Sequence, residues 1–192
     1  MSIKEERKIE IESIVKDFCD DYDLSTANPI DVVAIARKKG FKVQRLNMDA
    51  DTTGMLLYSE GSNITGLDTN KLIAVKNGLS EEQSRLILAH ELGHFSLFSK
   101  ETSLIAHRRY SHLKISNSEQ EADYFARALL MPEKHVMSII RNSKSENHDD
   151  NSIIHEIAET YNVTEAKAKI RFYEIEQRML NDEENNSSNK EN

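Results

Sequence analysis

The run His90-Glu91-Leu92-Gly93-His94 places two histidines four positions apart, with a glutamate directly after the first. On an α-helix, residues i and i+4 project from the same face, so both imidazole rings can bind one cation. Glu91 flanks that face, where its carboxylate could accept a proton from a water molecule that the cation activates. The pattern therefore predicts a metal site with His90 and His94 as ligands and Glu91 as the general base.

A third ligand is expected, because catalytic zinc typically takes three protein ligands and keeps one coordination position open. Glu119 and Asp123 are four positions apart and share a helix face. We predict that Glu119 is the third ligand and that Asp123 accepts the free N–H of a ligating histidine, which fixes that ring's tautomer. The alternative is Glu121 as ligand, with Glu119 compensating the helix dipole.

Capping signals and hydrophobic periodicity predict the helices that position these residues. Residues 3–24 carry apolar side chains at steps of three and four, which predicts a helix. Residues 29–39 are expected to form a second helix, because Asn28-Pro29 is a typical start and Gly40 a typical end. Ser80–Gln83 and Ser118–Glu121 are capping boxes, and each opens one of the two helices of the predicted metal site. A further short helix is expected from Pro132 to about Arg141.

Short apolar runs between the second and third predicted helices are typical of β-strands, because glycines and polar turn residues separate them. The runs cover residues 41–43, 55–58, 63–65 and 72–75. The expected fold class is therefore α+β, with a small antiparallel sheet packed on the helix of the His-Glu-x-x-His motif. An extended peptide substrate is expected along an edge strand, either 55–58 or 72–75.

The C-terminal part reads as a separate helical segment after a polar loop over residues 142–151. Residues 153–179 resume as two short helices, and their start resembles the first half of a helix-turn-helix. Residues 152–180 contain five acidic and four basic residues, so they lack the positive charge that is typical of a DNA-binding segment. A packing or substrate-recognition role is therefore preferred. The predicted units are residues 1–141, a helical module at 152–180 and a disordered acidic tail at 181–192.

Composition narrows the class of protein further. The 192 residues carry 25 Lys and Arg against 33 Asp and Glu, and this net charge of −8 argues against direct nucleic-acid binding. No apolar run approaches the ~20 residues of a membrane span, and the N-terminus lacks a signal-peptide pattern, so a cytoplasmic protein is expected. The single Cys19 leaves histidines and carboxylates as the available metal ligands.

The two motifs taken together resemble the ImmA/IrrE family of zinc metallopeptidases. The first ends in His-Glu-Leu-Gly-His-Phe at Phe95, and the second reads Glu-Gln-Glu-Ala-Asp-Tyr-Phe-Ala-Arg-Ala-Leu-Leu-Met-Pro from Glu119. The similarity covers about residues 29–135. It implies a gluzincin-like site on a zincin-type helix, with Glu119 as third ligand. Relatives often have Asn where this chain has Asp123, a mild departure because both side chains accept an imidazole N–H.

This resemblance also implies a function. Members of the family are cytosolic Zn2+-dependent endopeptidases that cleave a helix-turn-helix transcriptional repressor and so derepress mobile-element or stress genes. The alternative is an anti-repressor that binds its partner without cleaving it, and Glu91 favours cleavage because a pure scaffold needs no base. Manganese or iron could use the same ligands. The oxyanion of the reaction needs a further electrophile, for which Tyr110, His107 and His112 are candidates.

Overall fold

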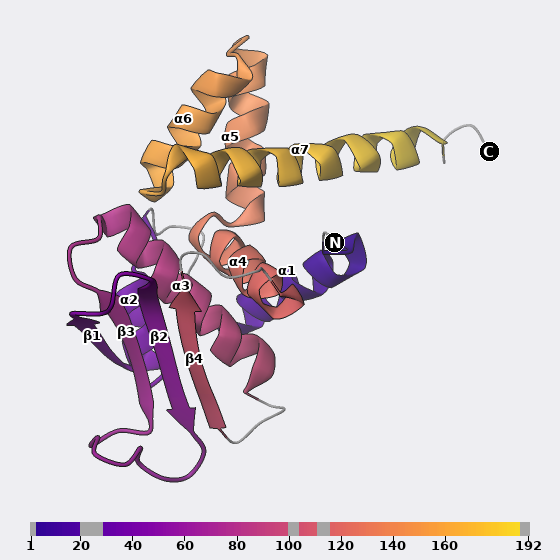
Figure 1. Ribbon diagram of the computed structural model, residues 1–192. Helices are drawn as coiled ribbons and strands as arrows, with labels where there is room; N and C mark the ends of the chain where they lie inside the picture. Colours follow the sequence, from indigo (N-terminus) through magenta and orange to yellow (C-terminus); the bar gives the residue numbers. More distant parts are fainter. Residues whose placement is uncertain (1–2, 20–28, 100–103, 111–115, 189–192) are drawn as a thin grey trace.

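The computed structural model describes residues 3–19, 29–99, 104–110 and 116–188 (Figure 1). The helices and strands of these residues follow one another in the order α1 (Glu5–Phe18), α2 (Val32–Lys38), β1 (Lys42–Leu46), β2 (Thr52–Ser59), β3 (Lys71–Lys76), α3 (Glu81–Phe98), β4 (Leu104–Tyr110), α4 (Asn117–Leu130), α5 (Glu133–Ser145), α6 (Asp150–Tyr161) and α7 (Glu165–Ser188). The predicted α+β class is confirmed.

The described strands form one mixed sheet in the order β1-β3-β2-β4. β2 runs antiparallel to both of its neighbours, with Leu56 opposite Ile73 of β3 and opposite His107 of β4. β1 runs parallel to β3, so the expectation of a wholly antiparallel sheet is wrong. β3 lies between β1 and β2 and runs in the same direction as β1.

Two strand expectations change with this topology. Residues 104–110, which are not among the predicted strands, form β4, an edge strand of the described sheet. Residues 63–65 were expected as a strand, but Ile64 donates to the carbonyl of Thr69 and accepts from Leu67 within a local turn. The runs 55–58 and 72–75 lie inside the sheet, so neither offers the free edge that was expected for a peptide.

Helices α2 and α3 cover one face of the sheet, and α1 and α4 pack on the far side of α3 (Figure 1). The core between these layers is apolar and closed to solvent. It includes Leu56 and Ile73 from the sheet, Leu88 and Leu92 from α3, and Phe125 from α4, each at most 2% exposed. The burial of these apolar side chains is the main force that holds α3 between the sheet and α4.

The N-terminal caps of α3 and α4 differ in how well the sequence predicts them. Ser80 and Gln83 form the predicted capping box of α3. α4 is capped by Ser116, whose Oγ accepts from the Glu119 amide at 3.3 Å, so the capping box at Ser118 is wrong. Glu121 faces α1, where its carboxylate pairs with Arg7 at 2.6 Å. Glu121 is therefore neither a capping residue nor a ligand of the histidine motif.

The C-terminal helices pack on the body of the protein and share its hydrophobic core. The predicted break between them lies at Asn162, which adopts a left-handed conformation with φ of 50°. α5 continues to Ser145, beyond the expected end at Arg141. α7 is helical as far as Ser188, whereas the sequence analysis expected disorder from residue 181. The division of the chain into domains stays a prediction.

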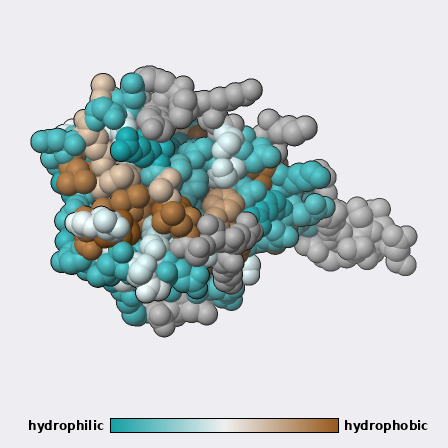
Figure 2. All heavy atoms as spheres, turned by 60° about the horizontal axis from the view of Figure 1, so that its bottom comes forward, coloured by the Kyte–Doolittle hydropathy of each residue, from teal (hydrophilic) through white to brown (hydrophobic). Residues whose placement is uncertain are grey.

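The surface is mostly hydrophilic, and Figure 2 shows apolar atoms gathered in a band across the middle of one face. Large apolar side chains that are exposed among the described residues are Ile9, Leu104, Ile170, Tyr173 and Leu180. Among the described helices, none combines the length and apolar composition that crossing a membrane requires.

Candidate metal centre

The middle of α3 holds the three charged or ionisable residues of the motif inside the protein. His90 and Glu91 are fully buried, and His94 is 5% exposed. The Nε2 atoms of the two histidines face each other at 3.1 Å, as the spacing of four residues on a helix predicts. Two imidazoles in this arrangement can present their nitrogens to one ion.

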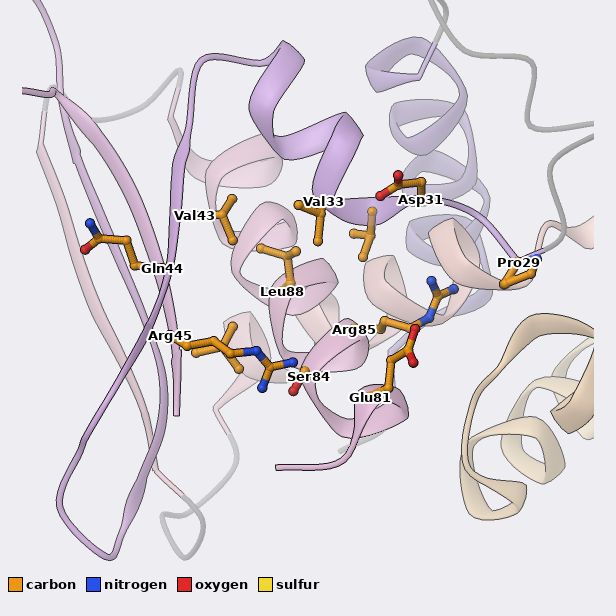
Figure 3. Close-up of a pocket in the computed structure, with 12 residues that line it drawn as sticks. Pro29, Asp31, Val33, Val43, Gln44, Arg45, Glu81, Ser84, Arg85 and Leu88 are labelled. Atoms are coloured by element: carbon orange, nitrogen blue, oxygen red, sulfur yellow. The ribbon is translucent and has the colours of Figure 1, made fainter. Parts of the chain in front are cut away.

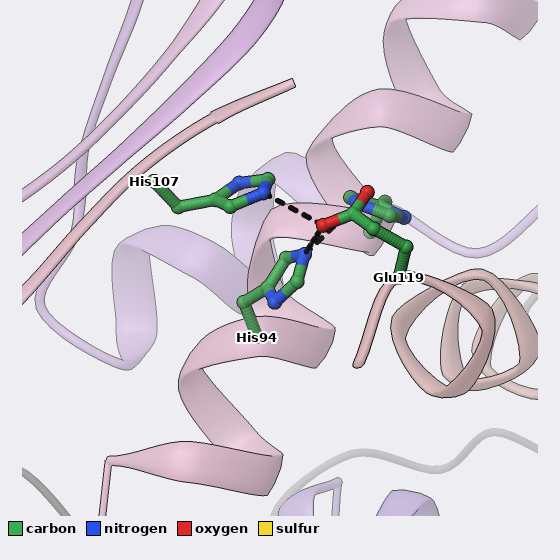
Figure 4. A group of neighbouring side chains, drawn as sticks. His94, His107 and Glu119 are labelled. Carbon is green, nitrogen blue, oxygen red and sulfur yellow. Dashed lines mark hydrogen bonds and ion pairs between the residues drawn. The ribbon is translucent and has the colours of Figure 1, made fainter. Parts of the chain in front are cut away.

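Glu119, in the first turn of α4, completes the group. Its Oε1 lies 3.0 Å from Nε2 of His94, and its Oε2 lies 3.3 Å from Nε2 of His90 (Figure 4). Burial alone raises the pKa of Glu119, but the hydrogen bonds from His107, His90 and His94 more than offset this and hold the pKa well below its usual value. The carboxylate is therefore ionised and offers both oxygens.

His107 joins the group from the edge strand β4. Its Nε2 lies 2.8 Å from Oε1 of Glu119, and its Nδ1 lies 2.9 Å from Oε2 of Glu91. Burial lowers the pKa of His107, but these two carboxylates outweigh burial and raise the pKa to about 9. The possible ligand atoms of His90, His94, His107 and Glu119 all lie within 4.8 Å of one another.

Asp123, one turn further along α4, holds the ring of His90. Its Oδ1 lies 2.9 Å from Nδ1 of His90 and accepts from Nη2 of Arg109 at 3.0 Å. Burial raises the pKa of Asp123, but His90 and Arg109 more than offset this, so the pKa lies well below its usual value. An ionised carboxylate can only accept, so Nδ1 of His90 is the donor to Asp123, and Nε2 is the ring nitrogen that is left to bind a metal ion.

Glu91 has one oxygen paired and one without a hydrogen-bond partner among the described residues. Oε2 contacts His107, whereas the buried Oε1 has no partner. A Cβ at Gly54 of β2 would lie 2.9 Å from this Oε1 and 2.4 Å from Cγ2 of Ile87. Glycine at position 54 therefore lets β2 pass directly over the Glu91 carboxylate.

The residues fit a metal ion by the chemistry of their donors. Two imidazole nitrogens and one carboxylate are a common ligand set of catalytic zinc. The hydrogen bond between His90 and Asp123 is the outer support that metal-binding histidines usually have. The unpaired Oε1 of Glu91 is a buried acceptor that needs a proton donor such as water.

Gly93 allows α3 and α4 to approach closely enough for this group to form. A Cβ at this position would lie 3.1 Å from the Cα and the carbonyl oxygen of Ala122, and 3.2 Å from Cβ of Phe125. The nearest neighbours are backbone atoms of α4, which cannot move without moving Glu119 and Asp123. The small residue inside the motif is thus a packing requirement of the site.

We expect Gly93→Ala to destabilise the protein by about 1–3 kcal/mol, the usual cost of overpacking. In an ordinary helix the same change is stabilising by up to about 1 kcal/mol. The sign of the change in the free energy of unfolding therefore tests whether Gly93 packs against α4. Urea unfolding measures the difference. Ser96→Ala on the same helix is the control and is expected to stay within about 0.5 kcal/mol. A Gly93→Ala protein more stable than the wild type would contradict the packing argument.

The sequence-predicted site residues His90, Glu91, His94, Glu119 and Asp123 lie together in the structure. His107 was predicted as one of three oxyanion candidates, and it contacts two of these residues. His112 and the side chain of Tyr110 lie outside the described residues. The signal that could have favoured His107 is the apolar run Leu104–Ala106 before it, which is typical of a strand.

Most of the chain is similar to one known protein family. Residues 36–173 match the model of the peptidase M78 family, described as the IrrE N-terminal-like domain. The match extends beyond the 29–135 region of the resemblance and includes α6 and part of α7. No curated protein matches the chain. Among solved structures, a Mycobacterium tuberculosis transcriptional regulator is similar, with 17% identity and a TM-score of 0.48. The similarity covers 86% of this chain and 46% of that one.

Proposed function

The chain belongs to the peptidase M78 family, and on this premise we propose that it is a zinc-dependent endopeptidase of the cytoplasm. Its proposed substrate is a helix-turn-helix transcriptional repressor, and cleavage derepresses the genes that this repressor controls. The observation that carries the proposal is the group of two imidazoles and one carboxylate beside the buried, unpaired Oε1 of Glu91. A purely structural cluster has no need of that carboxylate.

His90, His94 and Glu119 are the residues that would hold the metal. Zinc bound there acts as a Lewis acid that activates water and polarises the scissile carbonyl group. Oε1 of Glu91 takes the proton of the attacking water, and the same carboxyl group then delivers it to the leaving amine. Glu91 is well suited to this role because it is buried and His107 fixes its other oxygen at 2.9 Å.

The substrate is proposed to lie along β4, an edge strand of the described sheet. An edge strand has free backbone N–H and C=O groups, which can pair with an extended peptide. His107 lies on this strand and reaches Glu91 and Glu119, so a peptide paired with β4 would pass directly over the reacting groups.

His107 is proposed to donate a hydrogen bond to the oxyanion that forms on the scissile carbonyl. We expect His107→Ala to keep its metal and to lower kcat about 10²- to 10³-fold, the usual cost of losing one such donor. Metal content by mass spectrometry and kcat on a cleavable peptide are measured on the same sample. A variant that loses its metal would instead make His107 a ligand.

Asp123→Ala should weaken metal binding about 10- to 100-fold, because the ring of His90 loses the partner that fixes its tautomer. Asp123→Asn is the matched variant and should recover most of the affinity, since the amide oxygen still accepts the N–H. Competition with a chelator measures both constants. Equal affinities for the wild type and Asp123→Ala would show that the hydrogen bond does not support the metal.

The function is tested directly with the repressors encoded beside the gene. Each purified helix-turn-helix protein is incubated with the chain, with and without chelator, and the fragments are identified by mass spectrometry. We expect cleavage at a defined bond that the chelator abolishes. Repressors that all remain intact with metal-loaded protein, or cleavage that the chelator does not affect, would refute the proposal.

A further inference from the structure

A cavity of about 530 Å³ lies at the other end of α3, away from the metal cluster. Its walls come from α2 and the residues before it, β1, β3 and the first two turns of α3, and Figure 3 shows Val33, Val43 and Leu88 between the strand and the helices. This size is within the range of about 300–1,000 Å³ that is usual for small-molecule sites. None of the residues of the metal cluster lines the cavity.

One polar side chain in this cavity is buried without a partner. Ser84 is 7% exposed, and its Oγ has no hydrogen-bond partner among the described residues. The guanidinium of Arg45, from β1, lines the same cavity (Figure 3). Arg45 is exposed and forms no ion pair within the part of the chain that the structure describes. A buried hydroxyl group without a partner is unfavourable unless something completes its hydrogen bonds.

The other charged side chains of the cavity have hydrogen-bond partners or lie beside an opposite charge, and of their buried atoms only Nε of Arg85 lacks a partner among the described residues. Asp31 caps α2 by accepting from the Ala34 amide at 2.9 Å. The guanidinium of Arg85 donates to the carbonyl groups of Ile30 and Tyr161, and the Glu81 carboxylate lies beside it (Figure 3). Arg45 is therefore the basic side chain of the cavity that has neither a hydrogen bond nor an ion pair within the described part of the chain, whereas Arg85 lacks a partner only at Nε.

The remaining wall is apolar and shaped by branched side chains. Val33 of α2, Val43 of β1 and Leu88 of α3 face one another across the cavity in Figure 3. An apolar wall with one cationic donor and one hydroxyl group at its side matches a molecule with an apolar body and one anionic end. One oxygen of a planar carboxylate can accept a hydrogen bond from the guanidinium group of Arg45, and the other oxygen can accept one from the Ser84 hydroxyl group.

We propose that this cavity is a second binding site, which takes a small carboxylate with a short branched apolar tail. Arg45 and Ser84 bind the carboxylate, and Val33, Val43 and Leu88 surround the tail. The same chemistry occurs in a free carboxylic acid and in the C-terminal residue of a peptide that ends in leucine. The site is separate from the metal cluster, so it stands whether or not the chain cleaves a repressor.

The test is a titration of the full, metal-loaded chain with isocaproate, followed by amide NMR. We expect saturable shifts at the backbone amides of residues 43–45 and 84–88, and much weaker binding of acetate and of the neutral isocaproamide. Removal of the metal by a chelator should leave these shifts in place. Shifts centred on His90 and His94, or equal binding of the acid and its amide, would overturn the proposal.

Two variants locate the contacts. Arg45→Gln and Ser84→Ala should each weaken isocaproate binding about tenfold, because each removes a hydrogen bond to a charged group. Arg37→Gln is the matched control, since Arg37 is an exposed arginine of α2 outside the cavity, and it should bind like the wild type. Unchanged affinity in both Arg45→Gln and Ser84→Ala, with native spectra, would refute the site.

The source of the carboxylate is distinguished with a tripeptide. Acetyl-Ala-Ala-Leu with a free C-terminus is compared with its C-terminal amide under the same conditions. Binding of the free peptide at least as tight as isocaproate, lost in the amide, assigns the site to a chain end. Binding of isocaproate without binding of the peptide assigns it to a free acid. Failure of both ligands to bind would overturn the proposal.

Discussion

Replacing Glu91 with Gln should leave metal content unchanged and lower the rate of peptide hydrolysis about 10³- to 10⁴-fold, the upper range for a lost general base. Glutamine has the same shape but cannot take the proton of the attacking water. Glu91 is buried, with one oxygen held by His107 and the other without a partner among the described residues. Metal analysis and cleavage rates are measured on the same preparation.

The same variant separates cleavage from simple binding. Glu82→Gln, in the first turn of the same helix, is the control and should keep full activity. If Glu91→Gln still releases the genes that the repressor controls, the chain acts by binding, and the proposed cleavage is wrong. A Glu91→Gln protein that hydrolyses its substrate at the wild-type rate would remove Glu91 from the mechanism.

Replacing Glu12 with Leu should lower the free energy of unfolding by about 3–5 kcal/mol, the cost of breaking a buried ion pair from one side. Arg171 of α7 is fully buried, and its Nη1 donates to Oε1 of Glu12 at 2.7 Å. Its Nε donates to the carbonyl of Met131 at 3.0 Å. An arginine keeps its charge, so removal of Glu12 leaves a buried cation without its main partner. Urea unfolding at neutral pH measures the loss.

A double-mutant cycle assigns this loss to the pair. Glu12→Leu combined with Arg171→Met should recover much of the stability, because a buried pair replaced by apolar residues is often neutral. If the double variant is as unstable as the sum of the single variants, the two side chains do not interact.

The pH dependence of Glu12→Leu follows from the direction of the pKa shift. Burial raises the pKa of Glu12, but Arg171, Tyr124 and Arg178 more than offset this, so the pKa lies below its ordinary value of 4.5. A lowered carboxyl pKa contributes stability that is complete above 4.5 and lost as the pH falls through the folded-state pKa. The advantage of the wild type over Glu12→Leu should therefore shrink in acid.

Ion pairs and hydrogen bonds also connect α4, which carries Glu119 and Asp123, with α1 and with the C-terminal helix α7. Tyr124 of α4 donates to Glu12 at 2.7 Å, and Arg127 of α4 pairs with Glu174 of α7 at 2.6 Å. α4 carries Glu119 and Asp123 in its first two turns. The segment that reads as a separate module in the sequence therefore supports the helix that provides the third predicted ligand.

Local sequence signals predicted which side chains of α3 and α4 share a helix face. The spacing of His90 and His94, and of Glu119 and Asp123, fixes a shared face as soon as each segment is a helix. The cap of α3 is equally local, since Ser80 and Gln83 bond each other. The predicted cap was wrong for α4, because Ser116 and Ser118 are two positions apart and offer the same kind of signal, and the structure has Ser116 as the cap.

What the sequence by itself determined is which residues share a single helix, namely two histidines and a glutamate on α3 and two acidic residues on α4, together with the α+β class. The tertiary structure decided that β4 is an edge strand, that His107 on it reaches both Glu91 and Glu119, and that Gly54 and Gly93 admit the close contacts. The physical reason is that helix faces follow from the backbone period. Strand order and the approach of two helices depend instead on contacts between residues far apart in the chain.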